Sequence, residues 1–456
     1  MASVLARRIA GACLLTVVLA TSACGGGVTP SPEVLGPLPT DGLPTDGVPA
    51  DGVPGMSPGT GAFVPTDVPV PAGVAGDAGL GPPAWVQPGM RLTWYGAAAS
   101  VAQSSYTYVE DPAGTWEDPA TGKRYSRTDQ TGDDMPTAAG EAYTETDVIA
   151  VEGTDVVLVN NMYSIDLLAQ QFVLNPLGGG RVPGAVVDGA WVNPVALQSV
   201  LATGYEGFQI LRGDYVLGDN TYAAISFVSN GVGAYQASTF DTESGVLLRT
   251  NTSTEGAGSP VHGPLDNPQG NVQLSNTRLV GVRQRSLAGL DAPVPWWVAP
   301  GGQLVYTGSY TATNPLDPSS GPWVFPMETT VSFNEVGGTW ASFSSHTVTD
   351  LGGTQQPSDG TSVTGPNGLY WYDPDSLASM YVGELLDEDP VTGARTSVES
   401  VGPGAADTVV TIVAGANGVT VRTGYDMDSG VLVSLEIVQA VTGGTVSLQL
   451  ASGLPG

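Results

Sequence analysis

The chain has 456 residues, 41% of them hydrophobic, so it is long enough to build two or three domains with cores of their own. Its 14 basic and 44 acidic residues give a formal net charge of -30, which argues against nucleic acid as a partner because phosphates must be met by clustered cations. Cys13 and Cys24 are the two cysteines. The chain beyond residue 24 therefore excludes thiol nucleophiles, internal disulfides and cysteine-ligated zinc.

Residues 1–23 have the layout of a secretory signal peptide. Arg7 and Arg8 precede an apolar run at 9–20, which is too short to cross a bilayer comfortably. We expect this segment to be removed on export, and no later run is apolar for long enough to span a membrane.

The segment Thr21-Ser22-Ala23-Cys24 follows this run and resembles the lipobox of bacterial lipoproteins. The resemblance implies cleavage before Cys24, diacylation of its sulfur and attachment of the chain to the bacterial cell membrane or envelope, outside the cytoplasm. Two acyl chains would make that attachment stable. Thr21 stands where the family usually has Leu, so ordinary cleavage after Ala23, without a lipid, stays open as an alternative.

A tether rich in Pro, Gly and Asp is expected at 24–83. A five-residue unit of the form Leu-Pro-Thr-Asp-Gly recurs three times at 38–52, and proline and glycine at this density favour an extended chain without a core. Its aspartates are strung along the chain and are not gathered in one turn as calcium ligands are. We therefore interpret the segment as a disordered spacer.

Three segments of the remaining chain occur twice, in the same order. Each pair shares aromatic, glycine, proline or aspartate positions, at offsets of 212, 180 and 185 residues. Chance is a poor explanation of three ordered matches, so we infer an internal duplication. The pairs are 84–96 with 296–308, 189–197 with 369–377, and 240–248 with 425–433.

Each repeated segment has a structural interpretation. The Trp-Val-x-Pro-Gly segments predict a turn that leads into a strand, with a tryptophan covering one end of a core. Asn193-Pro194 and Asp373-Pro374 predict N-caps of short helices that end near Leu201 and Met380. The Asp-x-x-Ser-Gly segments predict tight hairpin turns with glycine at positive φ, a better account of Asp426 and Asp428 than a calcium loop.

Runs rich in Val, Thr, Ile and aromatic residues between these segments predict antiparallel strands. The expected fold is mainly β: two tandem copies of a curved, half-barrel-like antiparallel sheet, each with one short helix. The repeats are expected at 84–254 and 295–456, with a junction at 255–294. Whether 272–282 closes the first sheet or bridges the copies is left open. The strand runs include 147–159, 222–228, 303–311, 329–333 and 408–413.

Aromatic residues in the repeated segments are the candidate binding residues. They pair across the two copies, which fits either a core or a groove for an acyl chain, a glycan or an apolar peptide. They are Trp85, Trp94, Trp191, Trp297, Tyr306, Trp371 and Tyr372.

Catalytic chemistry is not expected. His262 and His346 have no counterpart in the other copy, and neither a Gly-x-Ser-x-Gly nor a His-Glu-x-x-His motif is present. Asp387, Glu388 and Asp389 precede a proline and are interpreted as a solvated loop. We therefore predict a protein that is not an enzyme and that binds no metal or cofactor.

The segment Trp371-Tyr372-Asp373-Pro374 is similar to an aromatic-Asp-Pro segment of the outer-membrane lipoprotein carrier family. This resemblance implies a half-open β-barrel with an apolar interior in each copy. The leading hypothesis is an anchored, non-catalytic protein that binds an apolar or polymeric ligand on a concave aromatic face. A structural or adhesion protein that contacts envelope proteins is the second hypothesis, and a hydrolase with two facing carboxylates is the third.

Overall fold

The computed structural model describes residues 81–102, 107–113, 116–117, 123–128, 135–166, 171–203, 209–217, 220–231, 234–255, 271–313, 321–403 and 408–453. The expected signal peptide, Cys24, most of the tether and His262 lie outside these residues. No helix in the described ranges is long and apolar enough to cross a membrane.

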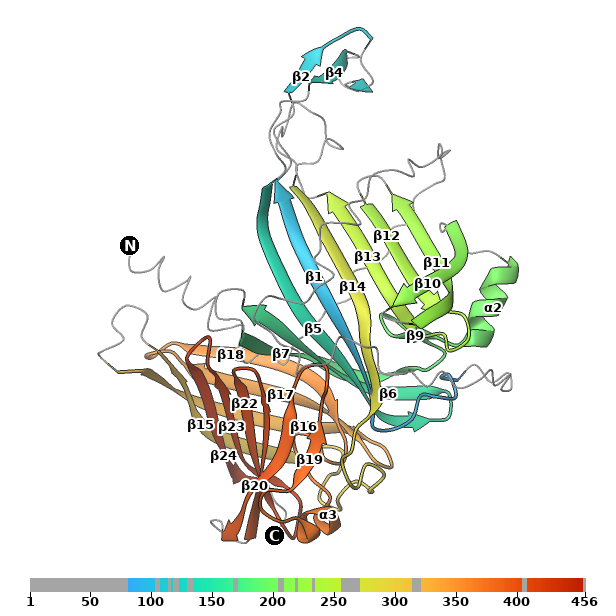
Figure 1. Ribbon diagram of the computed structural model, residues 1–456. Helices are drawn as coiled ribbons and strands as arrows, with labels where there is room; N and C mark the ends of the chain where they lie inside the picture. Colours follow the sequence, from blue (N-terminus) through green and yellow to red (C-terminus); the bar gives the residue numbers. More distant parts are fainter. Residues whose placement is uncertain are drawn as a thin grey trace.

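Two large antiparallel sheets, both visibly curved, make up the described part of the chain (Figure 1). The first has nine strands in the order β10-β11-β12-β13-β14-β1-β5-β6-β7, and the second has ten in the order β18-β17-β16-β15-β24-β23-β22-β21-β20-β19. The prediction of a mainly β protein with two tandem curved sheets is confirmed.

The strands of the first sheet are β1 (Met90–Ala102), β5 (Met135–Glu152), β6 (Asp155–Asp166), β7 (Gln171–Pro183), β10 (Gln209–Leu217), β11 (Asn220–Gly231), β12 (Ala234–Asp241), β13 (Leu247–Glu255) and β14 (Asn271–Gln284). Those of the second are β15 (Gln303–Ala312), β16 (Trp323–Val336), β17 (Ala341–Asp350), β18 (Gln355–Thr364), β19 (Leu385–Glu388), β20 (Arg395–Pro403), β21 (Thr408–Ala416), β22 (Val419–Asp426), β23 (Leu432–Gln439) and β24 (Gly444–Ser452).

Two smaller sheets belong to the first copy. One joins β2 (Thr107–Glu110), β3 (Trp116–Glu117) and β4 (Arg124–Thr128), and the other joins β8 (Val186–Val187) and β9 (Trp191–Val192). The three-stranded sheet lies at the far tip of β1 and β5 in Figure 1, away from the second large sheet. It interrupts the first copy between β1 and β5, while the described residues contain no strand between their counterparts β15 and β16.

The two large sheets match strand by strand when β1 is aligned with β15. Reading outward, β5, β6 and β7 correspond to β16, β17 and β18, and β14 down to β10 correspond to β24 down to β20. Strand β14 pairs with β13 and β1, so the segment that the sequence left open completes the first sheet. Only β19 has no partner of the same rank in the first large sheet, among the strands that the structure describes.

The repeated segments form the same contacts in both copies. Trp85 Nε1 donates to Ser244 O at 2.8 Å, and Trp297 Nε1 donates to Ser429 O at 2.9 Å. Each serine also closes the expected Asp-x-x-Ser-Gly turn, since Asp241 accepts hydrogen bonds from the backbone and side chain of Ser244 at 2.8 and 2.5 Å. The second turn repeats these two bonds at the same distances. The duplication inferred from sequence is therefore a duplication of structure.

Both predicted helices form, and both begin at the predicted residue. Helix α2 is Pro194–Thr203 and helix α3 is Pro374–Ser379. The Asp373 side chain accepts from Ser376 N, and Asn193 Oδ1 accepts from Val195 N at 2.9 Å. Proline at the first helical position costs no hydrogen bond there, which explains why these short helices start where they do.

The run at 147–159 is not one strand, which corrects the prediction. It ends β5 and begins β6, with a turn in which Gly153 has φ of 62°. The apolar alternation continues on both sides of the turn, so the pattern alone does not mark it. Glycine adopts this left-handed backbone without the steric cost that other residues carry.

The outer face of the first sheet packs against the second sheet. Successive side chains of a strand point to opposite faces, so Trp94 lies in the core of the first copy while Tyr95 points toward the second. Tyr95 belongs to a cluster that joins β1, β5, β6 and β7 to the second copy through Ala394, Ala416, Val419 and Val421. A second cluster joins Ile149, Ala150, Val157 and Val159 to Trp340 and Val363.

Two glycines of the first copy lie close to the second copy. A Cβ atom on Gly281 would lie 2.9 Å from Val391 Cγ2, and one on Gly179 would lie 2.3 Å from Leu158 O of its own sheet and 3.0 Å from Val363 Cγ2. Both valines belong to the second copy. The first copy therefore presents a surface shaped to the second.

Candidate functional site

The predicted aromatic residues of the first copy lie in its core. Trp94 and Trp191 are buried, and Trp85 is partly buried with its ring centroid 5.7 Å from that of Trp191. All three indole nitrogens donate to backbone carbonyls: Trp94 to Leu247 O at 3.2 Å, Trp191 to Gly184 O at 2.9 Å, and Trp85 as described above. Within the described residues, these polar atoms are already partnered.

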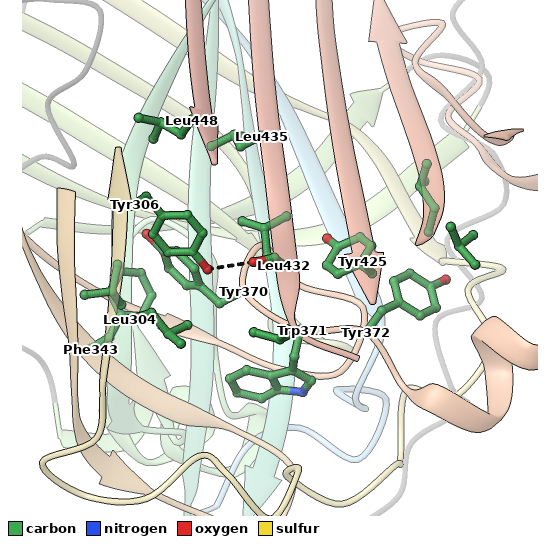
Figure 2. Packing of buried hydrophobic residues seen from close by; sticks show 14 of the residues in the cluster. Leu304, Tyr306, Phe343, Tyr370, Trp371, Tyr372, Tyr425, Leu432, Leu435 and Leu448 are labelled. Atoms are coloured by element: carbon green, nitrogen blue, oxygen red, sulfur yellow. Dashed lines mark hydrogen bonds between the residues drawn. The ribbon is translucent and has the colours of Figure 1, made fainter. Parts of the chain in front are cut away.

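The predicted aromatic residues of the second copy also lie together in a core, near α3. Trp297, Tyr306, Trp371 and Tyr372 are each at most 5% exposed. Figure 2 shows Tyr306 donating its hydroxyl to Leu432 O, a bond of 3.1 Å that takes the place of the Trp94 bond in the first copy. These four residues are therefore part of a core, and their role as ligand contacts stays a prediction.

Two of these residues carry polar atoms without a hydrogen-bond partner. Trp371 Nε1 is buried and unpartnered, in contrast to the equivalent indole of Trp191. The Tyr372 hydroxyl is also buried and unpartnered. Figure 2 shows the Tyr372 and Tyr425 hydroxyls pointing away from each other, and the Tyr425 hydroxyl donates to Gly368 O at 2.8 Å.

Three further unpartnered atoms lie on strands of the second sheet: Gln356 Oε1, Thr364 Oγ1 and Gln439 Oε1. Gln356 and Thr364 lie on β18 opposite Thr349 and Ala341 of β17. They are on the face of the sheet that carries its core. Gln439 is only 2% exposed. Sequence reasoning missed all three, because a single polar residue in an alternating strand gives no sign of which face it occupies.

An unpartnered buried polar atom costs about 1–3 kcal/mol, so such atoms are rare in folded proteins. The second copy contains six of them among the described residues, the five named above and Asn367 Oδ1. In the described part of the first copy, oxygens without a hydrogen bond occur instead on side chains of strands that face the second sheet, such as Glu141 Oε2 and both oxygens of Glu145. The difference between the equivalent indoles, Trp191 with a partner and Trp371 without one, singles out the core around Trp371.

Burial raises the pKa of Tyr372, and the nearby Tyr425 adds to that effect. The pKa of Tyr306 is also raised by burial. Both hydroxyls therefore keep their protons across the ordinary pH range and can donate hydrogen bonds. The unpartnered Trp371 indole and Tyr372 hydroxyl are neutral groups, and they lie among the aromatic and aliphatic side chains of the core.

A second notable group is the inter-sheet ion cluster, which we define as Arg91, Glu145, Asp147, Arg283, Arg285, Asp387 and Asp389. Arg91 binds Asp147 through two hydrogen bonds of 2.7 and 2.8 Å, and its Nη1 lies 3.0 Å from Glu145 Oε2. Arg285 Nη1 donates to Asp147 Oδ2 at 3.2 Å. These residues come from β1, β5 and the end of β14, on the outer face of the first sheet.

The second copy contributes two aspartates to the cluster. Arg283 donates twice to Asp387 at 2.8 Å and once to Asp389 at 3.2 Å. Asp389 also accepts the backbone N–H groups of Val391 and Thr392, at 2.8 and 3.2 Å. Asp387 and Asp389 are 8% and 1% exposed, so the interpretation of this segment as a solvated loop is wrong for both.

The physical reason for that error is that the arginines lie about a hundred residues away in sequence. Carboxylates next to a proline turn are usually solvated, and no local signal reveals a cation that the fold brings to them. Glu388, between the two aspartates, does point to solvent and pairs with exposed Arg395 at 3.6 Å. The predicted solvent exposure is therefore confirmed for Glu388 alone.

The carboxyls of the cluster differ in acidity. Burial by itself raises the pKa of Asp147, but the charges of Arg285 and Arg91 outweigh burial and lower it to about 2. Burial raises the pKa of Glu145 to about 7; Arg91 opposes this rise, while Asp147 and Asp389 add to it. Glu145 is fully buried and neither of its oxygens accepts a hydrogen bond of good geometry.

This cluster binds the sheets together and is not arranged as a catalytic pair. Hydrolysis by two carboxylates needs a cleft between them, whereas here arginine side chains bridge the carboxylates. Within the described ranges, no three His, Cys, Asp or Glu side chains are placed to hold a metal ion. His346 lies on β17, exposed, with Nδ1 2.7 Å from Asp359 Oδ1.

No family model matches the chain, and no curated protein matches it. Among solved structures, one match is a protein of unknown function from the DUF3598 family of Nostoc punctiforme. It is 11% identical and covers 79% of this chain and 95% of that chain, with a TM-score of 0.10. A TM-score this low supports no conclusion about fold or function.

Proposed function

We propose that this chain is an exported, lipid-anchored, non-catalytic protein that binds an apolar ligand with a few hydrogen-bonding groups inside its second sheet. The observation that carries the proposal is the set of five buried polar atoms without partners: Trp371 Nε1, the Tyr372 hydroxyl, Gln356 Oε1, Thr364 Oγ1 and Gln439 Oε1. A ligand that pairs with these atoms would remove their desolvation cost.

The chemistry of the wall supports the class of ligand. The core around Trp371 and Tyr372 is built from aromatic and aliphatic side chains. The five unpartnered atoms are an indole nitrogen, a phenol hydroxyl, a threonine hydroxyl and two amide oxygens, all of them uncharged, so neutral polar groups can pair with them without bringing a charge into the core. An apolar body with neutral polar groups matches both features.

The cellular location rests on the sequence. The lipobox-like segment ending at Cys24 and the apolar run before it support export and acylation. The segment that follows would hold the two sheets away from the lipid surface. Mass spectrometry of the mature amino terminus tests this part: an unmodified residue after cleavage would contradict it.

The ligand is tested by native mass spectrometry and organic extraction of the full-length protein purified from its own membrane. We expect a co-purifying molecule at one per chain. The variant Tyr372→Phe is expected to carry less ligand, because it removes a hydrogen-bonding group from the site. Its matched control is Tyr425→Phe, whose hydroxyl already bonds to Gly368 O.

Stability separates the proposal from a purely structural protein. In a ligand-free interior, Tyr372→Phe would raise the free energy of unfolding by about 1 kcal/mol or more, because it deletes an unpartnered hydroxyl. Tyr425→Phe would lower it by about 1 kcal/mol. A protein with no bound molecule and a stabilised Tyr372→Phe variant would favour a structural or adhesion module of the envelope instead.

A further inference from the structure

The inter-sheet ion cluster has one more acid than base. It contains the three arginines Arg91, Arg283 and Arg285 and four carboxyl groups. Were all seven groups ionised, the cluster would carry a net charge of about -1 inside a contact that excludes water. Such an excess is removed most easily by a proton on one carboxyl group.

Glu145 is the carboxyl group least compensated by its surroundings. Asp147 accepts hydrogen bonds from two arginines, and Asp387 accepts two from Arg283 and one from Ser286 N at 3.0 Å. Asp389 is held by Arg283 and two backbone N–H groups. Glu145 has only its 3.0 Å ion contact with Arg91, which is shared with Asp147.

The groups that face Glu145 come from both sheets. Arg91 lies on β1, Asp147 on its own strand β5, and Tyr163 on β6. Arg283 and Arg285 come from the end of β14, and Asp387 and Asp389 from the second copy. Charge on Glu145 therefore acts directly on the contact through which the first sheet lies against the second.

We propose that Glu145 makes the docking of the two sheets sensitive to pH. With Glu145 protonated, the cluster is balanced and the first sheet stays docked. With Glu145 ionised, the buried excess charge near Asp147 and Asp389 loosens the contact, and the two sheets separate more often.

The direction follows from linkage. The pKa of Glu145 is raised from 4.5 to about 7 in the docked state, so protonation favours docking. Docking is strongest below about pH 4.5, weakens as the pH rises toward 7, and changes little above that. Asp147 titrates below this window because its pKa is lowered to about 2. Opening should therefore increase between pH 5 and 8, at most on the order of a hundredfold, since Glu145 keeps Arg91 and Asp147 beside it in the undocked sheet.

Hydrogen–deuterium exchange of the full-length protein, with exchange times scaled for the intrinsic effect of pH, measures this opening. We expect protection of β7, β18 and the turn at 389–394 to fall between pH 5 and 8 while β23 changes little. Glu145→Gln, which is neutral at every pH, should keep these segments protected at pH 8. His346→Gln removes the described histidine near β18 and should behave as the unchanged protein does.

Flat protection of the contact segments in the unchanged protein would overturn the proposal. So would a Glu145→Gln variant with the same pH dependence as the unchanged protein, or loss of that dependence in His346→Gln. If Glu145→Gln does not fold, Asp389→Asn serves in its place. It removes the single excess negative charge of the cluster and should reduce the pH effect several-fold, and an undiminished effect would contradict the role given to the cluster.

Discussion

Single side chains in this protein are constrained chiefly by what lies opposite them on another strand or another copy. Asp387 and Glu388 are neighbours in sequence, yet Asp387 is buried against Arg283 while Glu388 is exposed. The alternation of a strand puts them on opposite faces. Both carboxylates have the same neighbours in sequence. Asp387 can be buried because Arg283 meets it on its face of the strand.

Replacement of Arg91 tests how much the inter-sheet ion cluster contributes to the free energy of unfolding. Arg91→Met leaves Asp147 and Glu145 without their shared cation in a buried contact, so we expect a loss of about 3–5 kcal/mol in the free energy of unfolding. Arg395→Met is the matched control, because its pair with Glu388 is exposed and contributes less than about 1 kcal/mol. Urea unfolding measures both variants. Equal, small losses would show that the cluster adds nothing to stability.

Turns and helix starts are the elements on which the duplication is most visible. Gly245 and Gly430 have φ of 74° and 70° in the two Asp-x-x-Ser-Gly turns. Their backbone carbonyls accept from Val192 N and Tyr372 N, each at 2.9 Å, which ties every turn to the segment before its helix. In each copy, the Asp-x-x-Ser-Gly turn thus holds the segment that leads into the helix.

Alanine at these glycines tests that arrangement. A Cβ atom on Gly245 would collide with Val192 O, and one on Gly430 with Tyr372 O. We expect each variant to lose about 2–4 kcal/mol from steric conflict together with backbone strain. Gly153→Ala is the control: its φ is 62° but no atom lies within 4 Å of the added Cβ, so about 1 kcal/mol is expected from strain alone. Thermal unfolding would show whether the three variants separate in this order.

At the scale of the whole molecule, the described chain is a docked pair and not one continuous sheet. The outer face of the first copy carries Tyr95, Tyr143, Tyr163 and Phe172 on four neighbouring strands, and their rings contact one another. This row continues the apolar contact beside the ion cluster. Each copy keeps its own core, so the contact between them is a separate contribution to stability.

Gly281→Ala tests the docking independently of charge. The added Cβ would lie 2.9 Å from Val391 Cγ2, so the turn of the second copy must move away. We expect faster hydrogen exchange at 389–394, with Gly180→Ala as a control because no atom lies near its added Cβ. Val391→Ala in the same chain should restore protection by making room. Unchanged exchange in Gly281→Ala would show that the turn at 389–394 accommodates the added methyl group without weakening the contact between the sheets.

The sequence by itself determined what depends on neighbours along the chain. The Asx-Pro pairs set the helix starts, the Asp-x-x-Ser-Gly segments set the turns, and alternating apolar runs set most strands. Comparison of the chain with itself then gave the duplication. These features are local because capping, turn geometry and strand alternation are satisfied within a few residues.

Only the tertiary structure decided which face of each sheet meets the other copy. The partners of Glu145 and Asp389 lie far away in sequence, and the burial of Gln356 Oε1 and Gln439 Oε1 without hydrogen-bond partners is visible only in the folded chain. Burial and charge pairing depend on distances through space, which no pattern along one strand contains. The candidate ligand site and the ion cluster both arise from that long-range packing.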